Sequence, residues 1–258
     1  MPKFAANLTM LWNEHGFLDR FAAAATAGFR GVEFLFPYAF PAEQIAERLR
    51  QHRLELVLHN LPAGNWEAGE RGIACHPDRV AEFQDGVGMT IAYATTLGVK
   101  QVNCLAGIVP KGVTRDAAHA TFVANLAFAA AELKGAGIRL LIEPINTFDI
   151  PGFFLSGTRQ AVDIIGEIGS DNLFVQYDIY HMQRMEGELA NTIKANIAQI
   201  RHLQLADNPG RNEPGTGEIN YAFLFRFIEQ LGYDGWIGCE YKPATTTAAG
   251  LSWIASYR

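Results

Sequence analysis

Short apolar runs alternate with longer amphipathic segments from one end of the chain to the other. The apolar runs are apolar along most of their length, which is typical of strands that are buried on both faces of a parallel sheet. Eight such candidate strands cover residues 4–8, 32–36, 54–60, 101–107, 139–143, 173–178, 200–205 and 236–240. Strict alternation of strands and helices predicts an α/β fold in which helices cross over between parallel strands.

The segments between the strands have helical periodicity and recognisable ends. The clearest predicted helices cover residues 17–27, 41–51, 78–97, 115–134, 157–168 and 220–231. Thr114 and Asn220 stand where an N-cap is expected. A glycine follows five helices, where the chain has to adopt a left-handed conformation, at Gly28, Gly98, Gly137, Gly169 and Gly232.

Eight strand and helix units in 258 residues favour closure into a single (β/α)8 TIM barrel spanning 1–258, and no stretch of the sequence resembles a linker. An open doubly wound sheet is the alternative. That fold usually carries a glycine-rich G-x-G-x-x-G turn after its first strand, and none follows residues 4–8. We therefore predict one barrel domain.

Composition and charge exclude several classes of protein. With 49% apolar and 19% charged residues, the chain can bury a large core. A net charge of -6 without a Lys/Arg cluster disfavours nucleic acid as a partner. The N-terminus lacks the features of a signal peptide and no run is long enough to span a membrane, so we predict a cytoplasmic protein. Cys75, Cys104 and Cys239 are expected to be reduced.

Polar residues recur where the last four predicted strands end. Glu143, Asp178, Gln204 and Glu240 follow one another at a spacing close to one eighth of the chain. In a barrel of this kind the active site lies at the carboxyl ends of the strands, so these four side chains are expected to converge there. For each residue taken alone, capping of the next helix or pairing with an arginine is an equally good explanation.

Three carboxylates at one barrel mouth would repel each other and would be costly to desolvate. A divalent cation is the simplest compensation. Four oxygen ligands without Cys or His suit Mg²⁺ or Mn²⁺ and argue against zinc. The sequence therefore predicts a metal site formed by Glu143, Asp178, Gln204 and Glu240.

Two further residues are candidates for substrate contact. His181 follows Asp178 by three residues and is expected to overhang the same mouth from a loop. Arg211 lies in a Gly/Pro-rich loop, and its guanidinium is suited to a substrate carboxylate. Glu33, His59 and Asn60 either line the opposite side of the pocket or are buried hydrogen-bonded groups.

Several long segments resemble one known family over the full length of the chain. They are FAANLTM, GVEFLFPY, LHNLPAGNWEAGERGIA, LIEPINTFDIPGFFLSGTRQA, QYDIYHMQRMEGEL, HLQLADNPGRNEPGTGEINY and GCEYKP. They are similar to the hydroxypyruvate isomerase branch of the xylose-isomerase-like barrel superfamily. This resemblance implies a TIM barrel isomerase of small sugar acids.

The resemblance also implies roles for residues. Related ketose epimerases and isomerases hold a metal with Glu, Asp, His and Glu, which correspond here to Glu143, Asp178, Gln204 and Glu240. Gln204 in place of His weakens the case for metal dependence. By the same resemblance Glu143 and Glu240 are the catalytic acid/base pair, and His181 and Arg211 contact the substrate. From its position on the third predicted strand, His59 is a further candidate for substrate contact.

The reaction implied is the interconversion of hydroxypyruvate and 2-hydroxy-3-oxopropanoate by proton transfer through an enediolate. The alternatives with the same site are a 2-oxo-tetronate isomerase and a ketose 3-epimerase. Phosphodiester hydrolysis would need a histidine-rich centre and a basic face. A barrel that only binds a sugar acid is the non-catalytic alternative. In every case the expected partner is a small molecule, and the sequence leaves open assembly into a homo-oligomer.

Overall fold

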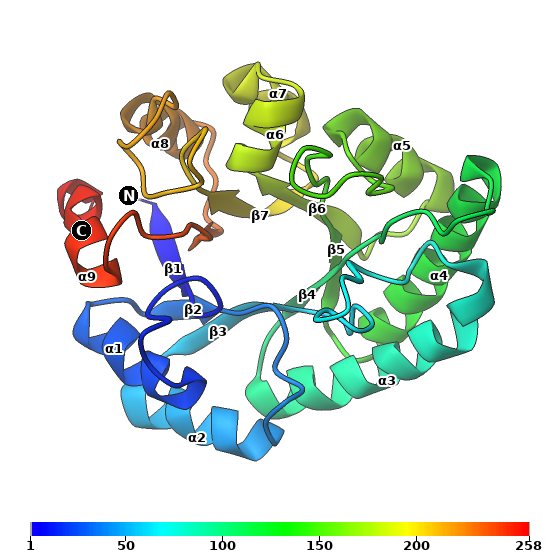
Figure 1. Cartoon of the computed structure of the whole chain (residues 1–258), viewed down its shortest axis with the longest axis horizontal. Helices are drawn as coiled ribbons and strands as arrows, with labels where there is room; N and C mark the ends of the chain where they lie inside the picture. Colours follow the sequence, from blue (N-terminus) through cyan, green and yellow to red (C-terminus); the bar gives the residue numbers. More distant parts are fainter. Residues whose placement is uncertain (1, 258) are drawn as a thin grey trace.

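Eight parallel strands form a closed barrel in chain order, with β1 paired to β8 (Figure 1). The computed structural model describes residues 2–257. The strands are β1 Lys3–Asn7, β2 Gly31–Glu33, β3 Glu55–Asn60, β4 Gln101–Cys104, β5 Arg139–Ile142, β6 Leu173–Asp178, β7 Ile200–Leu205 and β8 Trp236–Cys239. The predicted (β/α)8 barrel is confirmed, and the open-sheet alternative is wrong.

Helices surround the barrel on the outside (Figure 1). They are η1 Phe17–Asp19, α1 Arg20–Thr26, α2 Ala42–His52, η2 Pro77–Arg79, α3 Val80–Leu97, α4 Arg115–Gly135, α5 Thr158–Ile168, α6 Ile179–Met185, α7 Leu189–Asn196, α8 Tyr221–Gln230, α9 Thr247–Gly250 and η3 Ser252–Tyr257. Among the helices of residues 2–257, none is both long and apolar enough to cross a bilayer.

The predicted helix ends agree with the structure. The hydroxyl of Thr114 accepts the N–H of Ala117, and the side chain of Asn220 accepts the N–H of Phe223. All five glycines expected at helix ends have positive φ, between 66° at Gly169 and 87° at Gly28. The three cysteines are buried and free, as expected.

Several predicted strands extend too far toward their carboxyl ends. Residues 101–107 were expected to form one strand, but pairing ends at Cys104, opposite Ile142. Strand β2 ends at Glu33 instead of residue 36. Apolar periodicity continues into loops that stay buried, and it does not reveal where the partner strand ends. Glu143 and Glu240 consequently stand one residue beyond their strands.

The loop expected after the sixth strand is a helix. Asp178 accepts the N–H groups of Tyr180 and His181 at 2.7 and 3.2 Å and so caps α6. The expectation that His181 lies in a loop is therefore wrong. A place in the first turn of α6 holds the His181 side chain more firmly than a loop would, because Asp178 caps that turn and accepts the N–H of His181.

The barrel interior changes from apolar to polar toward the cavity. A small apolar cluster of Ala5, Val57, Leu58 and Leu141 fills one layer. In another layer, the buried Glu33 carboxylate accepts hydrogen bonds from Asn7, His202 and Gln204 at 3.0, 2.7 and 2.8 Å. Gly238 leaves the room for this carboxylate, since a Cβ at that position would meet the Glu33 oxygens.

Candidate active site

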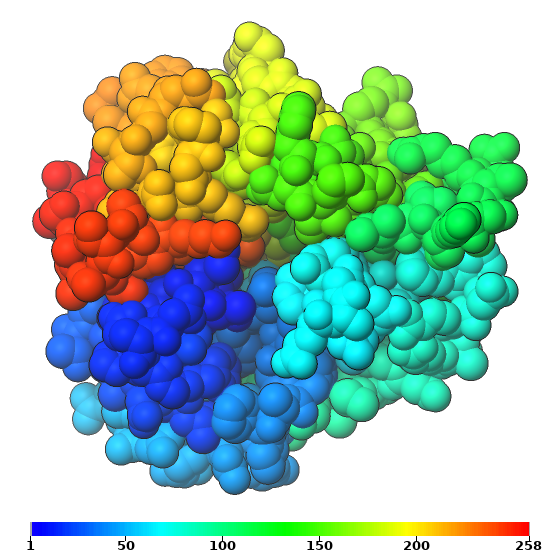
Figure 2. All heavy atoms as spheres, in the orientation of Figure 1, coloured from blue at the N-terminus to red at the C-terminus, as the bar shows by residue number. Residues whose placement is uncertain are grey.

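A cavity of about 660 Å³ opens at the carboxyl ends of the strands, and Figure 2 shows it as the hollow in the visible face. The predicted residues Glu143, His181, Arg211 and Glu240 line it. Other lining residues come from the end of β3 and from the loops after β1, β3 and β5, namely Thr9, Met10, Asn60, Trp66, Arg71, Asp149 and Ile150. Of the four predicted strand-end residues, Glu143 and Glu240 thus line one cavity, whereas Asp178 and Gln204 are not among its lining residues.

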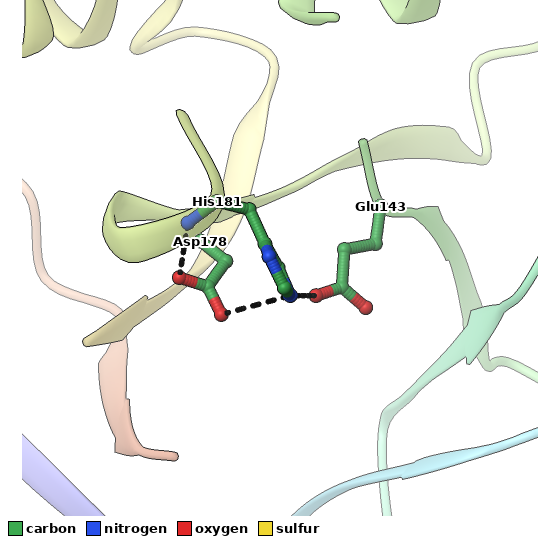
Figure 3. A group of neighbouring side chains, drawn as sticks. All are labelled: Glu143, Asp178 and His181. Carbon is green, nitrogen blue, oxygen red and sulfur yellow. Dashed lines mark hydrogen bonds and ion pairs between the residues drawn. The ribbon is translucent and has the colours of Figure 1, made fainter. Parts of the chain in front are cut away.

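Glu143, Asp178 and His181 form a tight group in this cavity (Figure 3). The imidazole Nε2 of His181 lies 3.9 Å from Glu143 Oε1 and 3.7 Å from Asp178 Oδ2. One donor atom from each of the three residues lies within 4.8 Å of the others. All three side chains are buried. This arrangement could hold a cation.

Glu240 is held by more hydrogen-bond donors than Glu143. Its Oε1 accepts Arg211 Nη2 at 2.8 Å, and its Oε2 accepts Gln204 Nε2 at 2.5 Å and Asn7 Nδ2 at 3.5 Å. Among residues 2–257, Glu143 has a single such partner, Asn103, whose Nδ2 lies 3.0 Å from Oε2. The two glutamates therefore differ in how strongly their surroundings favour the ionised form.

Burial sets the protonation of the site. It raises the pKa of Glu143 well above its ordinary value, and repulsion from Glu240 and Asp178 adds to the effect. Burial also raises the pKa of Glu240 to about 8, against the opposing charge of Arg211. The pKa of His181 is lowered well below its ordinary value by burial and by Arg211, so its imidazole is neutral.

The residues present fit a divalent cation, with one exception. Asp178 Oδ2 is buried without a hydrogen-bond partner, although it faces two other potential ligands. A cation bound there would supply that missing partner and would relieve the repulsion between the carboxylates. Gln204 does not present an oxygen to this group. Its amide oxygen accepts Gln176 Nε2 at 2.6 Å, and its Nε2 points to Glu33 and Glu240.

Asn146 determines which nitrogen of His181 carries the proton. The Oδ1 of Asn146 accepts the backbone N–H groups of Phe148 and Asp149, so its amide orientation is fixed. Its Nδ2 therefore donates to His181 Nδ1 at 2.6 Å. A neutral imidazole that accepts at Nδ1 has its proton on Nε2. Arg211 Nη2 approaches His181 Nε2 only to 3.5 Å, so the shorter bond from Asn146 decides the tautomer, and His181 directs an N–H donor toward Glu143 and Asp178.

Arg211 reaches the cavity in a tightly ordered turn. The carboxylate of Asp207 accepts backbone N–H groups from Gly215, Thr216 and Gly217, and the N–H of Arg211 donates to the Asp207 carbonyl. Arg211 has a φ of 55°, in the left-handed region. The expectation of a guanidinium at the mouth is met, but Nη2 is already paired with Glu240.

The structure places three further candidates differently from one another. Asn60 lines the cavity, whereas Glu33 lies deeper in the barrel with three hydrogen bonds of its own. His59 is not among the lining residues and matches the second alternative, a buried hydrogen-bonded group. Its ring lies 6.0 Å from that of Tyr38, and its Nδ1 lies 3.1 Å from the Asn60 carbonyl. Strand alternation explains this, since neighbours point to opposite sides.

Sequence reasoning missed Asn7, Asn103 and Asn146, which hold Glu240, Glu143 and His181. The first two interrupt apolar strands, in FAAN and QVNC, and that interruption is the signal that could have identified them. Asn146 follows its strand by several residues, and nothing in its sequence environment distinguishes it from a turn residue.

Comparison with known proteins gives a consistent result. Residues 21–257 match the family model described as xylose isomerase-like TIM barrel. The chain is 59% identical to hydroxypyruvate isomerase from Escherichia coli (strain K12), over 100% of both chains. It is 49% identical to 2-oxo-tetronate isomerase from Cupriavidus necator, over 100% of this chain and 99% of the relative.

Solved structures agree in fold. A structure titled AP endonuclease, family 2, from Brucella melitensis is 46% identical over 100% of both chains, with a TM-score of 0.98. An L-ribulose 3-epimerase structure is 23% identical, with a TM-score of 0.77, over 99% of this chain and 86% of the other. At that identity the second likeness concerns the fold alone.

Proposed function

Because this chain belongs to the xylose isomerase-like TIM barrel family, and two full-length relatives are named hydroxypyruvate isomerase and 2-oxo-tetronate isomerase, we propose that its cavity interconverts hydroxypyruvate and 2-hydroxy-3-oxopropanoate. The observation that carries this proposal is the pair Glu143 and Glu240, which line one cavity in different hydrogen-bonding environments. Two titratable groups whose surroundings differ in this way are suited to act as acid and base.

In the proposed reaction a carboxylate removes a proton from the hydroxymethyl carbon of hydroxypyruvate. The electron pair of that C–H bond forms the enediolate. A proton is then delivered to the neighbouring carbon, while the C3 hydroxyl gives up its proton and the former carbonyl oxygen gains one, so that carbonyl and hydroxyl exchange places. We assign the first step to Glu240, because Arg211, Gln204 and Asn7 favour its ionised form. We assign Glu143 as the acid, because burial and neighbouring carboxylates favour its protonated form.

His181 is assigned the stabilisation of the substrate oxygen on which negative charge develops. Its Nε2–H is directed into the cavity by Asn146, and a prearranged neutral donor of this kind acts as an oxyanion-hole group does. Glu143, Asp178 and Glu240 would hold a divalent cation, with Mg²⁺ or Mn²⁺ suited to their oxygen atoms. When bound, such a cation supplies Lewis-acid stabilisation of charge on oxygen.

A four-carbon 2-oxo acid is the second candidate substrate. A cavity of about 660 Å³ has room for more than a three-carbon acid, and a relative 49% identical is named 2-oxo-tetronate isomerase. Phosphodiester hydrolysis is disfavoured, because the candidate metal group contains a single histidine and the chain carries a net charge of -6.

Substitution of the two glutamates tests the proposed function. We expect Glu143→Gln and Glu240→Gln each to lower kcat with hydroxypyruvate by about 10²-fold or more, the usual contribution of a general acid or base. Glu55→Gln is the matched control, since Glu55 is exposed at the start of β3. Turnover in D₂O should place deuterium in the product.

Comparing hydroxypyruvate, 2-oxo-tetronate and free ketoses as substrates identifies the preferred one. Product without solvent deuterium would exclude the proton-transfer mechanism. Ligand binding without turnover of any of these substrates by the wild-type protein would leave a binding module.

A further inference from the structure

Four cationic side chains line the cavity, and they differ in whether a carboxylate neutralises them. Arg184 Nη1 is paired with Asp149 Oδ1 at 2.6 Å, and Arg211 Nη2 with Glu240 Oε1 at 2.8 Å. Within residues 2–257, Arg71 has no carboxylate oxygen within the 4.0 Å of an ion pair, and neither has Lys242. Arg71 and Lys242 are therefore the cations available to an acidic ligand.

Arg71 is fixed in place, unlike the exposed Lys242 side chain. Its Nη1 donates to the carbonyls of Trp66 and Glu70 at 3.0 and 2.7 Å. Its guanidinium lies 4.2 Å from the centroid of the Trp66 ring, which in turn packs against Phe36. In the described part of the chain, Nε and Nη2 have no partner. These two nitrogens form the edge of a guanidinium that binds a carboxylate through two parallel hydrogen bonds.

The loop that carries Arg71 is attached to the next loop of the barrel, and Figure 2 shows it in cyan beside the hollow. Gly72 has a φ of 114°, and a Cβ there would meet the backbone of Leu105 and Gly107. The N–H of Gly72 donates to Ala63 at 3.0 Å, and the N–H of Cys75 donates to Ala106 at 2.9 Å. The backbone next to Arg71 is thus held before any ligand binds, which reduces the entropic cost of binding.

Arg211, the carboxylate ligand expected from the sequence, is less suited to that role. Its Nε is buried without a hydrogen-bond partner among the described residues, but its Nη2 is paired with Glu240, so the two nitrogens are not both free for a substrate carboxylate. Withdrawing Arg211 to bind a substrate would leave Glu240 as a buried carboxylate without its main counter-charge, which is costly. Arg71 can bind an anion without giving up an ion pair.

We propose that Arg71 binds the carboxylate of the substrate through Nε and Nη2 and thereby makes the site selective for 2-oxo acids over neutral ketoses. This inference rests on the proposed function, because it places the carboxylate of that same substrate. Arg71 is a binding and specificity residue, distinct from the groups that move protons. Among the described residues, Arg71 and Lys242 have no carboxylate partner, and of these two cations Arg71 is the one held in place at the cavity.

The test compares a charged and a neutral substrate. Dihydroxyacetone has the hydroxymethyl ketone of hydroxypyruvate, with a second hydroxymethyl group in place of the carboxylate. Pyruvate keeps the 2-oxo acid but lacks the reacting hydroxyl group, so it reports binding without turnover. Arg71→Met removes the guanidinium, and Arg71→Lys keeps the charge without the planar pair of donors. Arg226→Met, at an exposed position of α8, is the control.

We expect Arg71→Met to raise the Kd of pyruvate and the KM of hydroxypyruvate by about 10²-fold, the loss expected for two charge-assisted hydrogen bonds. Its kcat/KM with dihydroxyacetone should equal that of the wild type. For Arg71→Lys, the Kd of pyruvate and the KM of hydroxypyruvate should lie between those of Arg71→Met and the wild type. Arg226→Met should behave as the wild type. A wild-type Kd for pyruvate in Arg71→Met, or an equal loss with dihydroxyacetone, would overturn the inference.

Two complications are separable. If Arg71→Met does not fold, Arg71→Lys decides, since acid binding weakened by about tenfold supports the inference and unchanged binding overturns it. If wild-type protein binds pyruvate and turns over neither substrate, the proposed function fails, and the Kd of pyruvate still tests Arg71.

Discussion

At the scale of single residues, the site depends on asparagines that orient its reactive groups. Asn7, Asn103 and Asn146 each donate to a group in or beside the cavity, and each is buried. An amide side chain can satisfy a carboxylate or an imidazole without adding charge. The reactive residues are therefore held by neutral groups, and the charge balance is left to Arg211, Asp178 and any bound cation.

Asn146→Asp tests the control of the His181 tautomer. Aspartate can still accept hydrogen bonds from the N–H groups of Phe148 and Asp149. It would also accept a hydrogen bond from a protonated Nδ1 of His181, whereas asparagine donates a hydrogen bond to that nitrogen. The proton would leave Nε2, and the donor into the cavity would be lost. We expect kcat to fall by about 10²-fold with little change in KM, comparable to removing an oxyanion-hole donor.

Nitrogen NMR of the imidazole would check this, since the tautomer signal of His181 should change while thermal unfolding remains cooperative. An unchanged tautomer together with full activity would show that Asn146 has no such role.

At the scale of elements, small residues determine which side chains the barrel can hold. Gly238 in β8 lies where a Cβ would meet the carboxylate of Glu33, and Glu33 bonds to Gln204, which bonds to Glu240. A glycine in one strand thus makes room for a network that reaches the cavity from another strand. Gly72 likewise lets the loop that carries Arg71 approach the backbone of Leu105 and Gly107, which a Cβ would meet.

Gly238→Ala should destabilise the protein by about 2 kcal/mol or more, because buried overpacking typically costs 1–3 kcal/mol and a buried carboxylate would lose its hydrogen bonds. The matched control is Gly88→Ala, at an exposed position of α3 where a Cβ meets nothing within 4 Å. That change should stabilise by about 0.5–1 kcal/mol, the usual difference between alanine and glycine in a helix. Urea unfolding of both variants makes the comparison, and equal stabilities would contradict it.

At the scale of the whole molecule, the cavity concentrates buried negative charge. Burial raises the pKa values of Glu143, Asp178 and Glu240, and that of Glu240 reaches about 8 from an ordinary value of 4.5. Between these two pH values, the folded protein therefore still binds protons that the unfolded chain has already released. We propose that the barrel unfolds as one domain, so this linkage should affect its single transition.

Without a divalent cation, the free energy of unfolding should decrease as the pH rises from about 5 to about 8, because the unfolded state then binds fewer protons than the folded state. Mg²⁺ or Mn²⁺ should raise Tm, and more so at the higher pH, since binding needs ionised carboxylates. Thermal unfolding with a chelator and with each metal provides the measurement. Glu240→Gln should reduce the slope. A Tm that rises over this range under chelation, with no response to either metal, would contradict the prediction.

Most of the fold was predictable from sequence because the apolar strands, the caps at Thr114 and Asn220 and the glycines after helices are local signals. Strand ends were less predictable, since pairing stops where a partner stops. The convergence of Glu143, Asp178 and Glu240 followed from their recurrence at strand ends. The two alternatives for His59 could not be separated from sequence, because a single residue in the register of a strand decides which side of the sheet a side chain faces.

The sequence by itself determined the barrel, the family and the identity of the residues at its mouth, because these depend on periodicity, spacing and long matching segments. Only the tertiary structure decided which charges neutralise one another, since that depends on atoms brought together from distant strands. It paired Arg211 with Glu240, turned the amide nitrogen of Gln204 toward two carboxylates, and left Arg71 without a carboxylate partner among the described residues.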